Sequence, residues 1–221
     1  MFIEIPNLLN KAELERLAAI FAAARFVDGR VSNPHNQTKK NLQIDPRDPL
    51  YPESVRIVGD ALARNEEVRN FTFFRRIASP LLCRYTPGMT YGAHPDAAFL
   101  PMNPAPLRSD LSCTVFLSPP ESYDGGELTI HLGTKPVVIK GELGSAVLYP
   151  STTIHEVVPV TRGERLVAIT FIESQICDER HRDLLYLLNE IAAIEGGNIS
   201  WESRVRLEHV RQSLHRMWST T

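Results

Sequence analysis

The 221-residue sequence predicts a mainly β, α+β protein, in which a sandwich or barrel of short strands is flanked by helices at both ends. Two observations support this prediction. From about residue 70 to residue 175, short runs rich in β-branched and aromatic residues alternate with turns that contain Gly and Pro. On both sides of this region, apolar residues recur every three or four positions, which is the period of an amphipathic helix.

Residues 1–69 are expected to form helices and a loop that pack on the core. Asn10 is a candidate N-cap, because Glu13 follows three residues later and apolar residues then recur at helical spacing. The polar stretch 26–49 shows little of either period and predicts a long loop with at most one strand. A second helix is predicted over residues 52–67, since proline is favoured in the first turn of a helix.

Residues 70–175 are predicted to form the β core. Seven runs have strand character: FTFFRRIA, PLLCRYT, LSCTVFLS, ELTIHL, PVVIK, SAVLYP and RLVAITFIE. The last run is apolar at nearly every position, so we expect a central strand that is covered on both faces.

Residues 176–221 are predicted to be a C-terminal helical extension. One helix is expected over residues 178–194, ending at Gly196 and Gly197, and another over residues 200–218. An apolar seam at coiled-coil spacing follows the second helix: Leu207, Val210, Leu214 and Met217. We expect this seam to pack against the β core, and a homodimer contact is the alternative.

Composition and charge narrow the functional classes. The formal net charge is −2 and no long basic run occurs, which argues against nucleic acid and anionic membranes as partners. The three cysteines are far apart and show no C-x-x-C spacing, which is typical of a reducing compartment. The N-terminus lacks the apolar core of a signal peptide, and no apolar stretch approaches about 20 residues. We therefore expect a soluble cytoplasmic protein.

The stretch YGAHPDAAF at residues 91–99 contains the most specific candidate site. His94 and Asp96 are two residues apart, and in an extended strand such side chains project to one face, roughly 6.6 Å apart. Pro95 between them favours extended geometry at His94. The pair therefore predicts two ligands of one metal ion.

A third ligand is expected from another strand of the β core. His155 lies among apolar residues and is the preferred candidate, whereas His131 alternates with polar residues and is expected on a polar strand face. Arg165 begins the most apolar run, where its charge must be matched either by Glu164 at the surface or by a bound carboxylate.

These four residues form a chemically coherent set. His94 and Asp96 are followed by 58 residues, then His155, then nine residues, then Arg165. Two imidazoles and one carboxylate are the facial ligands of Fe(II) that leave three positions open, two of them for a bidentate 2-oxo acid. The order suits a double-stranded β-helix, or jelly roll, in which the arginine holds the distal carboxylate of that acid.

Five longer blocks resemble one known family, the PKHD-type hydroxylases, which are bacterial relatives of prolyl 4-hydroxylase among the Fe(II)/2-oxoglutarate dioxygenases. The blocks are FVDGR at 26–30, RYTPGMTYGAHPD at 84–96, RSDLSCTVFLSPPESYDGGEL at 108–128, GSAVLYPSTTIHEVVPVTRGER at 144–165 and DERHRDLLYLL at 178–188. The resemblance covers nearly the whole chain. It implies hydroxylation of a substrate C–H bond while 2-oxoglutarate and O2 are converted to succinate and CO2, with ascorbate as a supporting reductant.

The resemblance also implies roles for particular residues. His94, Asp96 and His155 would be the catalytic iron ligands, and Arg165 would bind the C5 carboxylate of 2-oxoglutarate. Tyr85 matches the tyrosine of the R-Y-x-x-G-x-x-Y block and is implied as a second contact to the co-substrate, with packing in the core as the alternative. Animal prolyl hydroxylases often carry a tyrosine near the position of Phe116, which has no hydroxyl to offer.

Two other functional classes stay open at this point. One is a non-catalytic β-barrel that senses iron or an oxo acid with the same residues, and the other is a zinc hydrolase with the same three ligands. The substrate is a small molecule or a peptidyl group of unknown identity. Residues 97–110, which contain three prolines, are expected to form a semi-rigid lid beside the metal.

Overall fold

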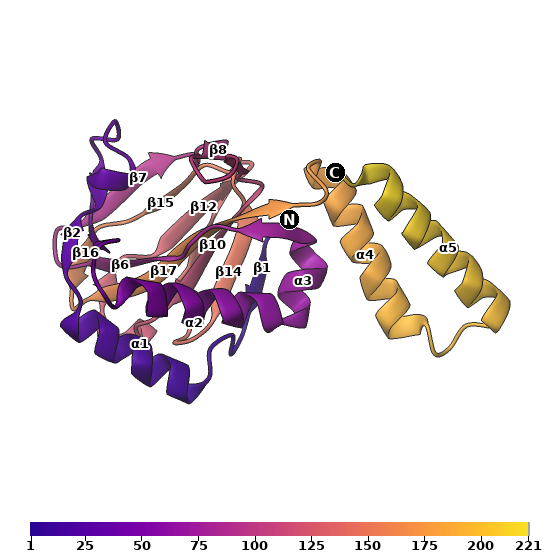
Figure 1. The fold of residues 1–221 in the computed structure, drawn as a ribbon, viewed down its shortest axis with the longest axis horizontal. Coiled ribbons are helices and arrows are strands. Elements are labelled where there is room, and N and C mark those ends of the chain that lie inside the picture. The colour runs from indigo at the N-terminus through magenta and orange to yellow at the C-terminus, as the bar shows by residue number, and fades with distance from the viewer. Residues whose placement is uncertain (221) are drawn as a thin grey trace.

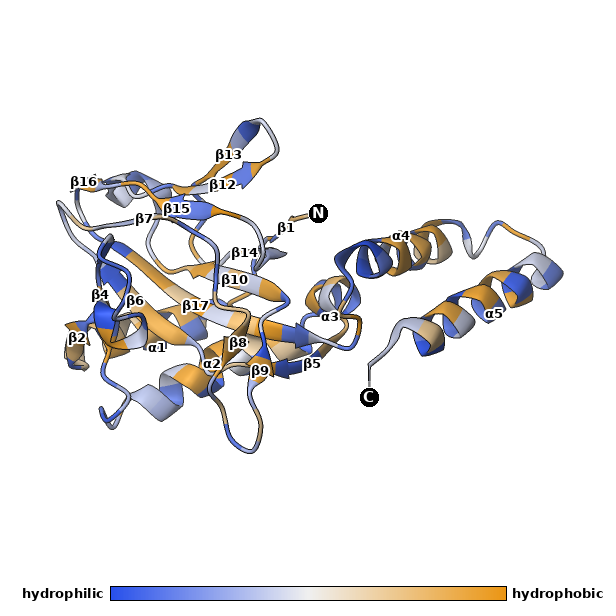
Figure 2. Ribbon diagram, turned by 90° about the horizontal axis from the view of Figure 1, so that it is seen from above, coloured by the Kyte–Doolittle hydropathy of each residue, from blue (hydrophilic) through white to orange (hydrophobic). Residues whose placement is uncertain are grey.

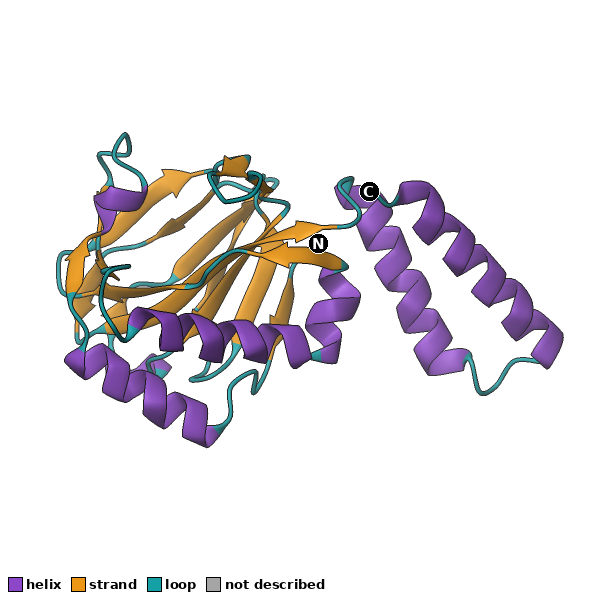
Figure 3. Cartoon of the chain, in the orientation of Figure 1, coloured by secondary structure: helices purple, strands orange, loops and turns teal. Residues whose placement is uncertain are grey.

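The computed structural model describes residues 1–220 and shows two antiparallel sheets with helices against one of them (Figures 1 and 3). The larger sheet has the spatial order β1 (Ile3–Ile5), β14 (Ala146–Pro150), β10 (Leu111–Phe116), β17 (Arg165–Ser174), β6 (Leu81–Tyr85), β4 (Leu42–Ile44) and β2 (Phe26–Asp28), and β5 (Phe74–Ile77) pairs with β17. The smaller sheet has the order β13 (Lys135–Ile139), β12 (Leu128–Leu132), β15 (His155–Val157), β7 (Thr90–His94) and β3 (Lys39–Lys40). The predicted mainly β architecture with flanking helices is confirmed.

Two short ribbons and two 3-10 turns complete the β region. The ribbons pair β8 (Phe99–Leu100) with β9 (Leu107–Arg108) and β11 (Asp124–Gly125) with β16 (Val160–Arg162), and the turns are η1 (Gly29–Ser32) and η2 (Pro120–Ser122). Residues 97–110, expected as a lid, thus form the β8–β9 hairpin. Arg76 donates hydrogen bonds from its guanidinium to the carbonyls of Ala105 and Pro106, which tethers this hairpin to β5.

Four of the five helices begin at a side-chain N-cap, and α2 begins with a proline in its first turn instead. They are α1 (Lys11–Ala23), α2 (Tyr51–Arg64), α3 (Glu66–Thr72), α4 (Glu179–Glu195) and α5 (Trp201–Trp218). Asn10 and Glu13 form the predicted capping box of α1. The single helix predicted over residues 52–67 is instead α2 followed by α3, because Asn65 leaves helical geometry and its side chain accepts from the Val68 N–H at 2.9 Å.

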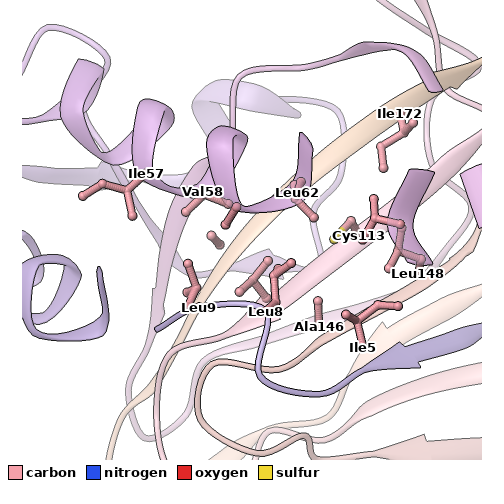
Figure 4. Close-up of a cluster of buried hydrophobic side chains, with 14 of the residues drawn as sticks. Ile5, Leu8, Leu9, Ile57, Val58, Leu62, Cys113, Ala146, Leu148 and Ile172 are labelled. Atoms are coloured by element: carbon pink, nitrogen blue, oxygen red, sulfur yellow. The ribbon is translucent and has the colours of Figure 1, made fainter. Parts of the chain in front are cut away.

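The larger sheet has an apolar core on each face. On its outer face, α1, α2 and α3 cover residues that alternate along the strands, among them Ala146 and Leu148 of β14 (Figure 4). Val147, between these two, points the other way into the cluster between the sheets, as the two-residue period of a strand requires. The sheet is therefore buried on both faces, as expected for β17.

The predicted loop 26–49 contains three short strands that join the two sheets. Lys39 of β3 pairs with Tyr91 of the smaller sheet, whereas Leu42 of β4 pairs with Arg84 of the larger sheet. This segment therefore crosses from one sheet to the other at one edge of the sandwich.

The helices α4 and α5 form a hairpin that extends away from the sandwich (Figures 1 and 3). The prediction that the α5 seam packs against the β core is wrong, because none of its residues is buried and Met217 is 74% exposed. The short connection after α4 folds α5 back along α4, and the end of α5 reaches the core through the Phe73–His215 ring contact. Apolar residues remain along both helices (Figure 2). No helix within residues 1–220 combines the length and apolarity needed to cross a bilayer.

Candidate metal and co-substrate site

The structure brings the three predicted ligands together between the sheets. His94 ends β7 and is the register partner of His155, the first residue of β15. Nε2 of His94 lies 3.9 Å from one oxygen of Asp96, and Nε2 of His155 lies 3.6 Å from the other. One donor atom from each residue lies within 4.8 Å of the other two, so the three side chains could hold one metal ion.

The local geometry of the pair differs from the expectation in one respect. His94 and Asp96 were expected to project from one extended strand, but β7 ends at His94 and Asp96 lies beyond Pro95. The backbone N–H of Asp96 donates to the Ser151 carbonyl at 3.2 Å, outside the ladder of β7. Asp96 therefore approaches the two imidazoles from the side of β14 and β10.

Backbone carbonyls fix the orientation of both imidazoles. Nδ1 of His94 lies 2.7 Å from the Gly92 carbonyl, and Nδ1 of His155 lies 3.0 Å from the Thr153 carbonyl. A carbonyl only accepts, so each Nδ1 carries the proton and each Nε2 presents a lone pair to the site. Burial, and next the neighbouring His155, lowers the pKa of His94, which favours the neutral donor form.

A chain of serine hydroxyls supports the carboxylate of Asp96. Ser112 on β10 donates to one Asp96 oxygen, and its own hydroxyl lies 2.8 Å from that of Ser151. Ser109 in turn donates to Ser151 at 2.8 Å. Sequence reasoning missed these serines, because only the approach of β10 and the turn after β14 to Asp96 gives them a role.

Arg165 is a fully enclosed cation at the far side of the same interior. It begins β17, is 2% exposed, and its guanidinium carbon lies 5.0 Å from the ring centroid of its register partner Tyr85. The Arg165 Nε has no hydrogen-bond partner. Among residues 1–220, no carboxylate oxygen, including those of Glu164, lies within 4.0 Å of the Arg165 guanidinium nitrogens. Gly126, at a φ of 69°, has no side chain; a Cβ there would lie 3.0 Å from the Arg165 side chain.

One cavity connects these groups. The three candidate ligands, Tyr85 and Arg165 all line it, and its remaining wall is mainly apolar and aromatic, with Leu128, Tyr149, Val157 and Ile169 among its residues. A buried guanidinium without a carboxylate partner is costly unless a ligand supplies the anion. The cavity therefore suits a molecule that carries a carboxylate at Arg165 and a second donor group at the metal position.

Two other residues considered from the sequence lie elsewhere. His131 is exposed on β12 and its Nε2 lies 3.4 Å from Glu156, away from the three ligands. Phe116 is buried in the apolar cluster between the sheets and does not line the cavity. Tyr91 and Tyr149, which sequence reasoning did not single out, flank the imidazoles at ring-centroid distances of 3.6 Å from His94 and 5.0 Å from His155.

Comparison with known proteins identifies the family. The sequence model of the 2OG-Fe(II) oxygenase superfamily matches residues 80–173. A PKHD-type hydroxylase of Sphingopyxis alaskensis is 50% identical over 97% of this chain and 98% of its own length. A PKHD-type hydroxylase of Alteromonas mediterranea is 37% identical over 98% of this chain and 99% of its own. The chain belongs to the PKHD-type hydroxylases.

Solved structures show the same fold for this PKHD-type hydroxylase. A prolyl hydroxylase of Trichoplax adhaerens, in complex with a hypoxia inducible factor peptide fragment, matches with a TM-score of 0.61 and 17% identity, covering 83% of this chain and 86% of that one. A prolyl 4-hydroxylase of Pseudomonas putida matches with a TM-score of 0.55 and 19% identity, covering 78% and 92%. These structures show that the chain has the double-stranded β-helix of that class. The family model and the relatives show that it is an Fe(II)- and 2-oxoglutarate-dependent hydroxylase.

The residues present fit the metal and the co-substrate of the family. Two imidazoles and one carboxylate, with donor atoms within 4.8 Å of one another, are a donor set that Fe(II) accepts. The unpaired Arg165 lies in the same cavity and offers a cation to a 2-oxo acid.

Proposed function

We propose that His94, Asp96 and His155 are the ligands of the catalytic Fe(II). The convergence of three donor atoms, each within 4.8 Å of the other two, is the observation that carries this proposal. The hydrogen bond that each side chain makes to another protein group also supports it, because these bonds orient the imidazoles and the carboxylate before any metal binds.

Arg165 and Tyr85 bind the distal carboxylate of 2-oxoglutarate. The buried guanidinium lies in the same cavity as the three ligands and lacks a carboxylate partner, and Tyr85 is its neighbour across the β17–β6 pair. Burial raises the pKa of Tyr85, so its hydroxyl remains a neutral donor at physiological pH. A carboxylate placed there receives a charge-assisted bond from Arg165.

When bound, Fe(II) and 2-oxoglutarate supply the oxidising chemistry, in which 2-oxoglutarate and O2 give succinate and CO2 and one oxygen atom becomes the hydroxyl of the product. The protein chain orients the metal-binding side chains and excludes water from the cavity. The carbonyls of Gly92 and Thr153 hold the imidazole protons at Nδ1, and Ser112 holds one oxygen of Asp96. Apolar residues such as Val157 and Ile169 keep the cavity dry.

Several further features belong to this proposal. The substrate is a small molecule or a peptidyl group; the peptide bound to the Trichoplax adhaerens prolyl hydroxylase, a protein of the same fold, supports the second class. Ascorbate acts as the supporting reductant, and the enzyme works in the cytoplasm.

The chain divides into three parts. The boundaries at residues 69/70 and 175/176 separate the N-terminal helices, the catalytic core and the C-terminal extension. The β8–β9 hairpin is the lid beside the metal.

We propose that the α4–α5 hairpin forms a homodimer contact. Apolar side chains along it are left exposed, with Ile191 at 50%, Ile194 at 69% and Trp201 at 72%. Monomers rarely leave such a row of large apolar residues in water.

The test is aerobic incubation with Fe(II), 2-oxoglutarate and ascorbate, with succinate as the readout. We expect succinate to form in the wild type, and Arg165→Met to raise the dissociation constant of 2-oxoglutarate by roughly 30-fold or more, because a buried charge pair is lost. Arg162→Met, at an exposed arginine of the same turn, is the matched control. Metal binding without oxygen consumption would favour the sensing barrel, and hydrolysis that survives exclusion of iron and O2 would favour a zinc hydrolase.

A further inference from the structure

Lys39 is a buried cation to which the proposed chemistry gives no role. It is 4% exposed, and its ammonium donates one hydrogen bond, to the Ser32 hydroxyl at 2.7 Å. No carboxylate among residues 1–220 lies within 4.0 Å of it. Burial lowers the pKa of Lys39, as expected for an ammonium that has lost water without gaining an anion. Such a charge is costly unless a ligand matches it.

Lys39 does not line the catalytic cavity itself, but its neighbours on the smaller sheet do. Lys39 and Val157 are the register partners of Tyr91 on its two sides, so the three side chains lie in one row across the smaller sheet. Tyr91 and Val157 line the cavity, and the Tyr91 ring stacks on His94 at 3.6 Å. The Lys39 ammonium lies 5.2 Å from the centroid of that ring, and β3 is the edge strand of the smaller sheet. There Lys39 lines a separate pocket together with Asp28, Asn41 and Met89.

The segment 39–43, which includes β3 and the start of β4, presents further unsatisfied polar groups to the interior. Burial alternates along it, with Lys39, Asn41 and Gln43 buried and Lys40 exposed. Both amide atoms of Asn41 and the amide oxygen of Gln43 are buried without a hydrogen-bond partner. Buried polar atoms in native proteins are nearly always paired, so this row indicates that a polar ligand completes it.

Charge balance indicates which kind of ligand is missing. On the proposed function, a divalent metal ion, the Asp96 carboxylate, the Arg165 guanidinium and the 2-oxoglutarate dianion together carry no net charge, and both imidazoles are neutral. The ammonium of Lys39, which is 4% exposed, is then one positive charge in excess beside this cavity. The co-substrate cannot supply the missing anion, because its two carboxylates are already matched.

We propose that Lys39 binds an oxyanion group of the substrate, such as a carboxylate, with the Asn41 amide as an additional hydrogen-bond donor. The enzyme therefore selects acidic substrates, and Lys39 is a specificity-determining residue. This inference rests on the proposed function, because the charge count includes the metal and 2-oxoglutarate.

The experiment uses acetate as the probe and acetamide as its neutral match of similar shape. The full chain is loaded anaerobically with Fe(II) and saturating 2-oxoglutarate, and the thermal unfolding midpoint is measured at constant ionic strength. We expect acetate at ten times its dissociation constant to raise the midpoint by about 3–5 °C and acetamide to leave it unchanged. Lys39→Met should abolish the acetate effect, whereas Lys39→Arg and the exposed control Lys40→Met should retain it.

Two further readouts separate this inference from its alternatives. Without acetate, Lys39→Met should unfold at a higher temperature than the wild type, since an unmatched buried charge has been removed. It should also bind 2-oxoglutarate within about two-fold of the wild type. Equal effects of acetate and acetamide, an acetate effect that persists in Lys39→Met, or a loss of 2-oxoglutarate binding in that variant would each overturn the inference. The proposed function fails separately, if the loaded wild type shows no metal-to-ligand charge-transfer absorption before acetate is added.

Discussion

At the scale of single residues, the proposed site depends on partners that orient each proposed ligand. Asp96 offers two oxygens, and the Ser112 hydroxyl occupies one of them, which leaves the other for a metal ion. Ser151 and Ser109 extend this bond into a chain of hydroxyls inside the protein. A carboxylate held in this way loses little freedom when the metal binds.

Removal of the first hydroxyl should therefore weaken metal binding. We expect Ser112→Ala to raise the dissociation constant of Fe(II) by about 10-fold or more, the usual effect of losing a hydrogen bond to a metal ligand. Ser112→Thr, which keeps the hydroxyl, should restore most of the affinity. The measurement is anaerobic competition with a colorimetric chelator, with the unfolding midpoint of each metal-free variant as a check on folding. An unchanged Ser112→Ala dissociation constant would mean that the hydroxyl does not position Asp96.

The sequence allowed some of these residues to be predicted and not others. His94, Asp96, His155 and Arg165 are spaced in a pattern that itself indicates a metal and an oxo acid. Ser112 and Lys39 carry no such signal. Their roles depend on which strands meet, and a buried lysine in a polar stretch resembles any solvated lysine until its burial is known.

At the scale of elements, the strands β2 and β4 hold the segment that carries Lys39. Asp45, directly after β4, accepts hydrogen bonds from the guanidinium and backbone of Arg47 and forms an ion pair with Arg25 at 2.6 Å. The hydrogen bonds from Arg47 are the main reason why the pKa of Asp45 is lowered to about 2. Its carboxylate thus fixes the end of β4 to the segment after α1.

This depressed pKa makes a prediction about pH. The stabilisation by Asp45 is fully present above its ordinary pKa of 3.8 and is lost as the pH falls towards 2. Asp45→Asn should therefore have a lower free energy of urea unfolding than the wild type at pH 7, and the difference should shrink between pH 4 and pH 2. Asp60→Asn, at an exposed carboxylate of α2, is the control and should change little. A difference that stays constant down to the lowest pH would contradict this role.

Elements with strong local signals were predicted, and those that depend on distant pairing were not. The capping box of α1 and the apolar run of β17 are visible in a few residues. Strands β3 and β15 have two and three residues, too few for a period, and they exist because the smaller sheet pairs with them. The break between α2 and α3 depends on Asn65, which favours a cap over a helix interior, but a single asparagine in a helical run does not by itself require a break.

At the scale of the whole molecule, a catalytic sandwich carries a helical hairpin that contributes nothing to the cavity. The prediction placed the α5 seam on the β core, because an apolar helix face needs a cover and the sequence does not say which surface provides it. In the structure, α4 covers part of α5, and large apolar residues of both helices remain exposed.

A homodimer through this hairpin predicts a defined hydrodynamic result. The wild type should sediment at about twice the chain mass of 24.9 kDa, and Ile194→Glu should shift it to the mass of one chain. Val138→Glu, at an apolar residue of the edge strand β13 that is 62% exposed, should remain a dimer. Sedimentation of the wild type as a single chain, or an Ile194→Glu variant that is still dimeric, would rule this contact out.

The central claim is that three side chains hold one Fe(II) and leave room for 2-oxoglutarate beside Arg165. Its most direct test is anaerobic titration of the protein with Fe(II) and 2-oxoglutarate, monitored by visible absorption. The wild type should develop a metal-to-ligand charge-transfer band that saturates at one Fe(II) per chain. Asp96→Ala and His155→Ala should lose the band, whereas His131→Ala, a histidine outside the site, should keep it. Absence of the band in the wild type, or its persistence in Asp96→Ala and His155→Ala, would contradict the claim.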